Sequence, residues 1–254
     1  MAGHSKWANI KRKKGAEDAK RAKIFTRLSR DIMVAAREGG GDESMNPSLS
    51  LAIQKAKDAN MPNDNIDRAI KRGTGELEGG EVEEFTYEGY GVEGVAFMIE
   101  VLTDNKNRSL AAVKAVFNKN NGSFANSGAV AYQFDQKGFI TLKKPEDDST
   151  IDFEEVFMVA AEAGAEDVVE EEGKVTIYTP RDQFGSVEQA LNENGYKSDD
   201  AELRWFPQLE LDVPLKVAVQ NMRIMEKLEE LDDVQNVFSN LNITDEVVQA
   251  YESN

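Results

Sequence analysis

Residues 1–38 read MAGHSKWANIKRKKGAEDAKRAKIFTRLSRDIMVAARE, and the interpretation of the whole chain starts from this stretch. It contains eleven Lys or Arg residues and four Asp or Glu residues, a net charge of +7, whereas the 254-residue protein carries −17. A basic segment in an acidic chain is typical of a surface that meets a polyanion. The alternative is a solvated helix face with a frayed terminus. The contrast with the acidic remainder favours contact with nucleic acid.

Residues 16–37 contain no helix-breaking residue and are rich in Ala, Lys, Arg, Leu and Met, which favour helices. At about 100° per residue, apolar and basic side chains fall on opposite faces. The apolar face comprises Ile24, Phe25, Leu28, Ile32, Ala35 and Ala36, and the basic face comprises Lys20, Lys23, Arg27, Arg30 and Arg37. The pattern predicts a helix with one side in a core and the other toward phosphates or water.

The residues before this helix lack an apolar period, and we expect them to form an arm that orders on contact with its partner. Trp7 either stacks on a base or packs onto the helical domain. We expect the nucleic-acid contacts of this region to come from Lys6, Trp7, Lys11, Arg12, Lys13, Lys14, Lys20, Lys23, Arg27 and Arg30. Backbone contacts, which fix position without reading sequence, are expected from Lys11, Arg12, Lys13, Lys14, Lys20, Lys23, Arg27 and Arg30.

The length and composition narrow the class of protein. A chain of 254 residues is expected to form two or three domains. No apolar run approaches the roughly 18 residues of a membrane span, and the charged N-terminus lacks the apolar core of a secretory signal. The absence of cysteine excludes disulfides, thiolate catalysis and Cys-ligated zinc. We therefore expect a cytoplasmic protein with no membrane partner, no bound metal and no small-molecule cofactor.

Three helices are predicted before residue 80. Gly39-Gly40-Gly41 ends the first, and Asn46-Pro47 begins the second with a capping Asn and a first-turn Pro. A third short helix is predicted over residues 64–72, and Gly73 closes it. Residues 73–80, GTGELEGG, have the composition of a linker.

The pattern changes to mixed strands and helices from Glu81. Residues 138–206 follow the order strand, helix, strand, strand, helix, strand, which is typical of a ferredoxin-like unit. The predicted elements there are strands over 138–142, 167–170, 174–178 and 203–206, with helices over 153–163 and 182–194. Outside this unit we predict strands over 85–88, 95–102, 129–134, 209–213 and 234–238, with helices over 107–119 and 215–231.

The outer elements complete a second strand–helix pattern, which predicts a split domain with another domain inserted in it. The predicted fold class is α+β, with an N-terminal three-helix domain and basic arm followed by two ferredoxin-like sandwich domains. The predicted domains are 1–80, 81–135 with 209–254, and the inserted 136–208. Three domains in simple series remain the alternative.

The sequence contains no pattern that supports a catalytic site or a cofactor site. Gly89, Gly91 and Gly94 spell G-x-G-x-x-G, but a dinucleotide site needs a helix after it, and here a strand follows. A hairpin connection is the better interpretation. His4 is the single histidine, so neither a His/Cys metal site nor a catalytic triad can be assembled. We expect a protein that is not an enzyme.

Residues 103–109, TDNKNRS, lie where a strand is predicted to turn into a helix. A helix N-terminus presents free N–H groups and partial positive charge, and Lys106 and Arg108 add full charges there. Both residues are candidates for a second phosphate contact. The alternative is a capped turn with exposed polar side chains.

Several segments together resemble the YebC family, and the resemblance covers nearly the whole chain. The segments are MAGHSKWANIKRKKGAEDAKRAKIF at the start, EGYG at 88–91, TDNKNR at 103–108, AGAEDV at 163–168 and DDVQNVFSN at 232–240. The sequence departs from the family pattern at Val92, where Pro is usual, and at Ala22, where Gly is common.

The resemblance implies a three-domain cytoplasmic or mitochondrial protein without known catalysis. Bacterial members are described as probable transcriptional regulators that bind DNA, and others look like ribosome-associated factors that relieve stalled elongation. Mitochondrial relatives look like translational activators for cytochrome c oxidase subunits. We expect a regulator of gene expression that binds DNA, or ribosomal or transfer RNA on the ribosome, with a slight preference for RNA. The alternative is a protein adaptor whose acidic domains bind a basic partner.

Overall fold

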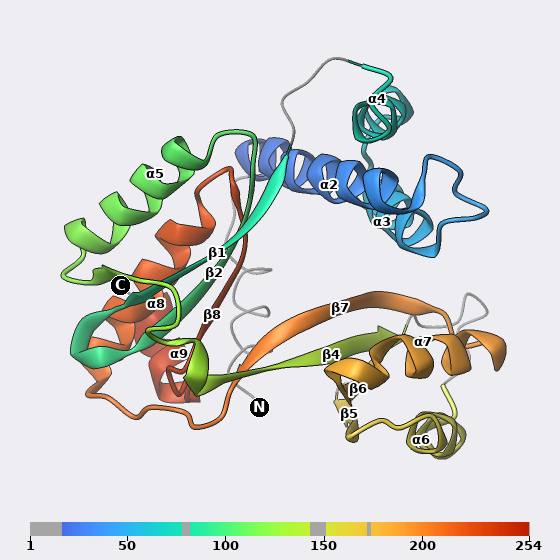
Figure 1. Ribbon diagram of the computed structural model, residues 1–254. Helices are drawn as coiled ribbons and strands as arrows, with labels where there is room; N and C mark the ends of the chain where they lie inside the picture. Colours follow the sequence, from blue (N-terminus) through green and yellow to red (C-terminus); the bar gives the residue numbers. More distant parts are fainter. Residues whose placement is uncertain (1–16, 78–81, 143–150, 172–173, 254) are drawn as a thin grey trace. The chain divides into compact units, whose positions relative to one another are not determined.

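The computed structural model describes residues 17–77, 82–142, 151–171 and 174–253, with side chains described from residue 24 onward (Figure 1). The chain divides into two compact units. One unit comprises Met1–Gln133 together with Pro207–Asn254, and the other is Phe134–Phe206. We call the first the split unit and the second the inserted unit.

The three predicted helices are confirmed as α2 (Glu17–Gly39), α3 (Pro47–Asp58) and α4 (Asn63–Gly73). The Asn46 side chain accepts a hydrogen bond from the backbone N–H of Leu49 and so caps α3 as predicted. The core of this layer contains Ile32, Ala35, Ala36, Leu49, Ala52, Ile53, Ala56, Met61, Ile66 and Ala69.

Two details of the helical layer differ from the prediction. Ile24 was expected on the buried face but is 46% exposed, because the apolar cluster begins with Phe25 and Leu28. Gly73 was expected only to close α4. A Cβ there would lie 2.4 Å from the carbonyl oxygen of Met33, so glycine is needed for α4 to pack against α2.

The split unit contains a four-stranded sheet of β1 (Glu83–Tyr90), β2 (Ala96–Thr103), β3 (Ser123–Ala125) and β8 (Val234–Ser239), in the order β3-β1-β2-β8. β2 pairs antiparallel with β8, which confirms that strands far apart in the sequence share one sheet. Helices α5 (Lys106–Lys119) and α8 (Leu215–Glu229) cover one face (Figure 1), and α9 (Asp245–Glu252) follows the last strand. The core includes Phe97, Phe117 and Met222, all 0% exposed.

The glycine motif at residues 89–94 is confirmed as a hairpin connection. β1 and β2 pair from Glu83–Thr103 to Tyr90–Ala96, and the 3-10 turn η1 (Val92–Gly94) joins them. A Cβ at Gly91 would lie 2.0 Å from Asn221 Oδ1, which accepts a hydrogen bond from Val92 N–H at 2.9 Å. Glycine at this position therefore lets α8 approach the turn.

The inserted unit confirms the predicted order of strand, helix, strand, strand, helix, strand. Its elements are β4 (Phe134–Leu142), α6 (Phe153–Glu162), β5 (Asp167–Glu171), β6 (Lys174–Pro180), α7 (Phe184–Glu193) and β7 (Ser198–Pro207). The strands form a sheet in the order β5-β6-β4-β7, which is the ferredoxin-like arrangement. Ile140, Val156, Ile177 and Leu191 form part of its core. Phe157, also on α6, is 48% exposed.

Two predicted strands are wrong. Residues 129–134 contain the 3-10 turn η2 (Ala131–Gln133), and β4 begins only at Phe134. Residues 209–213 form no regular strand, and only Leu211 makes an isolated parallel bridge, to Leu241. The short β3 and the final helix α9 were not predicted.

The fold class is therefore α+β, with N-terminal helices followed by two ferredoxin-like sandwiches, one inserted in the other. The domain boundaries at residues 80, 135 and 208 remain a proposal. The limits of the inserted unit at Phe134 and Phe206 support it.

Candidate nucleic-acid interface

The outermost basic residues of the N-terminus lie outside the described residues. They are Lys6, Trp7, Lys11, Arg12, Lys13 and Lys14. Lys20 and Lys23 belong to α2, but their side chains also precede the described ones. The nucleic-acid contacts predicted for these eight residues therefore remain predictions.

Arg27 and Arg30 contact the turn between α8 and β8 in the split unit. Arg27 Nη2 donates to the carbonyl of Glu229 at 2.9 Å, and burial lowers the pKa of the Arg27 guanidinium below its ordinary value. Arg30 donates through Nη1 to the carbonyl of Asp232 and through Nη2 to Asp233 Oδ1, the latter at 2.6 Å. The sequence predicted both arginines on a face toward phosphates or water. In the structure, this part of the face instead contacts the turn between α8 and β8.

Arg108 reaches the same carboxylate from the first turn of α5. Its Nε donates to Asp233 Oδ2 at 3.1 Å, and its Nη2 lies 2.8 Å from Oδ1. Asp104 accepts a further hydrogen bond from Nη2 at 2.9 Å. The hydrogen bonds to Asp233, followed by those to Asp104, raise the pKa of Arg108 above its ordinary value.

Asp233 is placed at this point by the end of β2 and the start of β8. Its backbone carbonyl accepts a hydrogen bond from Leu102 N–H at 2.9 Å, and the next residue begins β8. Only 9% of its side chain is exposed. A carboxylate at such a depth requires charged or hydrogen-bonding partners, and two guanidinium groups supply them.

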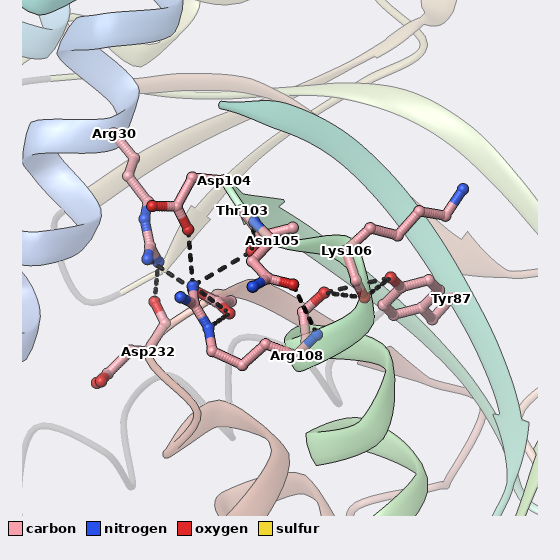
Figure 2. A network of polar contacts seen from close by, with 10 residues as sticks. Arg30, Tyr87, Thr103, Asp104, Asn105, Lys106, Arg108 and Asp232 are labelled. Carbon is pink, nitrogen blue, oxygen red and sulfur yellow. Dashed lines mark hydrogen bonds and ion pairs between the residues drawn. The ribbon is translucent and has the colours of Figure 1, made fainter. Parts of the chain in front are cut away.

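The predicted helix start at residues 103–109 is confirmed. The Asn105 side chain caps α5 by accepting from Arg108 N–H at 3.1 Å. Figure 2 shows the side chains of Lys106 and Arg108 pointing apart. Lys106 Nζ lies 4.4 Å from the centre of the Phe85 ring, whereas Arg108 faces Asp233. The structure therefore does not bring the two candidate phosphate contacts together.

A cleft of about 480 Å³ opens beside these ion pairs. Its lining includes Thr26, Arg30, Asp104, Arg108, Asp232 and Asp233. Two arginines and three aspartates give this set a negative balance. In its present form the cleft therefore does not attract an anion as strongly as the two arginines alone would.

The third helix exposes further cations. Arg68, Lys71 and Arg72 lie on α4 with exposed side chains, and no residue of the described part pairs with them. The sequence places Asn63 and Asn65 near the start of the same helix. Sequence reasoning missed Asp233, although DDVQNVFSN was noted as a family segment.

In the part of the chain that the structure describes, none of the helices has the length and apolar character needed to span a bilayer. The same residues contain no group of three or more His, Cys, Asp or Glu side chains placed to hold a metal ion.

The arrangement defines a class of protein with a helical N-terminal domain and two ferredoxin-like domains, one of them split. Comparison with protein families matches residues 5–76 to the "TACO1/YebC protein N-terminal domain" and residues 82–241 to the "TACO1/YebC second and third domain". The chain belongs to the TACO1/YebC family.

Similar proteins support this assignment over almost the full length. A protein of Halothermothrix orenii named "probable transcriptional regulatory protein" is 52% identical over 98% of both chains. A protein of Trichlorobacter lovleyi with the same name is 49% identical over 96% of this chain and 97% of its own. The crystal structure of a conserved hypothetical protein from Aquifex aeolicus is 42% identical, covers 90% of this chain and 93% of its own, and gives a TM-score of 0.78.

Proposed function

We propose that this protein is a non-enzymatic regulator of gene expression that binds nucleic acid through backbone phosphates. The observation that carries the proposal is the separation of charge between residues 1–38, at +7, and the whole chain, at −17. The relatives carry the name "probable transcriptional regulatory protein", and this name supports the regulatory part of the proposal.

The contacts would come first from the N-terminal cations. Lys11, Arg12, Lys13 and Lys14 form an uninterrupted basic run, and Lys20 and Lys23 continue it onto α2. The exposed cations of α4 extend the basic surface of the helical layer. Such contacts set position and orientation on a nucleic acid and carry little information about its sequence.

RNA is the preferred partner in this proposal. A DNA-bound transcription factor usually inserts a recognition helix, and α4 offers only Asn63, Asn65, Arg68 and Arg72 for that purpose. A factor on ribosomal or transfer RNA needs a basic arm and gains from an acidic body that avoids stray RNA. Residues 134–206 contain nineteen acidic and seven basic residues, a net charge of −12, and provide such a body.

Crosslinking in growing cells, followed by sequencing of the attached nucleic acid, tests the choice of partner. The proposal expects ribosomal and transfer RNA among the products. Enrichment of promoter DNA would replace translation with transcription as the regulated step. Recovery of neither class above a control protein would overturn nucleic-acid binding altogether.

A protein adaptor is the second candidate, and the surface of α6 favours it. Phe157 and Met158 are 48% and 60% exposed on a helix that also exposes Glu154, Glu155 and Glu162. Deletion of residues 1–16, which precede α2, separates the candidates. Loss of cellular partners in the deletion variant favours nucleic-acid binding through the arm, whereas retention of a basic protein partner favours the adaptor.

A further inference from the structure

We propose that Arg30 and Arg108 form a latent phosphate-binding site, which the carboxylate of Asp233 occupies in the free protein. The ligand would be a backbone phosphate of the nucleic acid that the N-terminal cations already hold. The inference therefore rests on the proposed function and adds a second point of contact to it. Figure 2 shows the arrangement of the two arginines.

The geometry around Asp233 is the one that arginine uses for phosphate. Arg108 directs Nε at Asp233 Oδ2 from 3.1 Å and Nη2 at Oδ1 from 2.8 Å, and Arg30 directs Nη2 at Oδ1 from 2.6 Å. Guanidinium forks bind the paired oxygens of a carboxylate and of a phosphate in the same way. Asp233 therefore stands where a phosphate with two free oxygens would stand.

The exposed fractions of the three side chains determine the order in which an entering phosphate would meet the two arginines. Arg108 is 52% exposed, whereas Arg30 is 12% and Asp233 is 9% exposed. A phosphate that enters the cleft meets Arg108 first, and Arg30 becomes available only when the carboxylate leaves. Because the Asp233 carbonyl is held by Leu102 N–H, the carboxylate can leave by side-chain rotation while the backbone stays in place.

The charge of the cleft determines which phosphate can enter. Asp104, Asp232 and Asp233 outnumber the two arginines, so a free phosphate ion is repelled while the carboxylate is in place. A phosphate in a strand that the N-terminal cations already hold has a much higher effective concentration at the cleft. The site should therefore respond to a polynucleotide and remain closed to inorganic phosphate.

The neighbouring aspartates provide a matched test. Asp233→Asn removes one negative charge and weakens the competitor of phosphate. Asp232→Asn removes one negative charge at an exposed position whose backbone carbonyl, and not its carboxylate, accepts from Arg30. The probe is a labelled single-stranded RNA oligonucleotide, titrated at several salt concentrations. Thermal melting of each variant shows that it is folded.

Asp233→Asn should bind the RNA about threefold or more tightly than Asp232→Asn, the effect of one modest ion pair. Its slope of log affinity against log salt should be steeper by up to about 1.4, because two added contacts each contribute about 0.7 on single strands. Equal affinities and slopes for the two folded variants would overturn the latent site. RNA binding by the wild type in that case would leave the proposed function standing, whereas no binding by any of the proteins would overturn the proposed function itself.

A second pair of variants keeps the inference testable if Asp233→Asn does not fold. Arg108→Gln should weaken RNA binding and flatten the salt slope by less than about 0.7, because the phosphate displaces Asp233 in only part of the wild-type complexes. Arg181→Gln, an exposed cation of the inserted unit, changes the net charge equally and should have little effect. Equal behaviour of these two variants would overturn the inference, as would inorganic phosphate that displaces the RNA from wild-type protein at micromolar concentration.

Discussion

Each unit contains a four-stranded sheet, but the chain visits the four positions of the two sheets in different orders. In the inserted unit the order β5-β6-β4-β7 arises from one continuous stretch. In the split unit, β3, β1, β2 and β8 take the corresponding places, but the strand equivalent to β6 is β1, which comes first in the chain. Each sheet carries two helices, α6 with α7 in one case and α5 with α8 in the other.

This difference shows that the layered packing of amphipathic elements, and not their connectivity, determines the sandwich. In the sheet of the split unit, β3 lies beside β1, and β1 joins β2 through a hairpin. The chain that follows β3 is therefore not needed to connect neighbouring strands of this sheet. The chain leaves the split unit after β3, forms the inserted unit, and returns at α8. A unit inserted in the chain after β3 therefore leaves the strand pairing of the sheet intact.

The two units also differ in the charge that they present to a partner. Residues 134–206 carry −12, whereas residues 1–38 of the split unit carry +7. The split unit additionally holds the ion pairs of Arg30 and Arg108 with Asp233. In our proposal, contact with nucleic acid therefore belongs to the split unit, and the inserted unit presents an acidic surface instead.

The largest expected effect comes from the core of the split unit. Phe97 in β2 is 0% exposed and packs edge-on against Phe117, so Phe97→Ala should cost about 3–5 kcal/mol of stability. Hydrogen exchange should show lost protection in β2 and retained protection in β6 if the two units unfold separately. Equal loss in both strands would contradict separate units. Phe157→Ala, at a 48% exposed position of α6, is the mild control.

A smaller effect is expected where the chain leaves the split unit. Glu88 is 4% exposed, and its carboxylate accepts from the backbone N–H groups of Gly128, Val130 and Ala131. Glu88→Ala leaves these donors without their acceptor and should cost about 2–4 kcal/mol, measured by urea denaturation.

Glu84→Ala is the control for this measurement, because Glu84 is exposed on the same strand. It should change stability by less than about 0.5 kcal/mol. Similar urea midpoints for the two variants would mean that Glu88 does not hold this loop.

The smallest effect concerns the inserted unit and alkaline pH. Burial, with a hydrogen bond to Glu155 at 2.7 Å, raises the pKa of Tyr196 to about 12. Between about pH 10, the ordinary tyrosine pKa, and pH 12, the unfolded state loses this proton and the folded state keeps it. The contribution of Tyr196 to stability is therefore full below pH 10 and declines as the pH rises through this window.

Tyr196→Phe should reduce the loss of stability of the inserted unit across that pH range, followed by the fluorescence of Trp205 during denaturation. Tyr132→Phe, at a 70% exposed position of the split unit, should leave it unchanged. An identical pH dependence in wild type and Tyr196→Phe would show that Tyr196 ionises equally in both states.

The sequence was sufficient to predict helices and strands in which apolar residues recur with a clear period. The stripe around Ile32 in α2 and the whole inserted unit follow from local patterns, and both were predicted. The strand β3 has only three residues, which is too short for a periodic signal. Residues 209–213 alternate apolar and polar side chains as a strand does, but only Leu211 finds a partner.

The candidate site was less accessible to sequence reasoning, because its partners are far apart in the chain. Arg108 and Asp233 are separated by 125 positions, and Arg30 and Asp233 by 203. Amphipathic periodicity placed Arg27 and Arg30 opposite the apolar face of α2, but it could not reveal that another surface of the split unit covers them. The basic arm was predicted from charge alone, and it remains a prediction because residues 1–16 lie outside the described residues.

The most direct test of the account is a salt titration of binding by the wild type and by a variant with Lys11, Arg12, Lys13 and Lys14 all changed to Gln. Both proteins are titrated with ribosomes and with duplex DNA. Each phosphate contact contributes about −0.9 to the slope of log affinity against log salt on duplex DNA and about −0.7 on single strands. The account predicts a slope on ribosomes that is flatter by roughly 3 at most, a smaller change on DNA, and an unchanged melting temperature. Equal slopes for the two proteins on both ligands would contradict it.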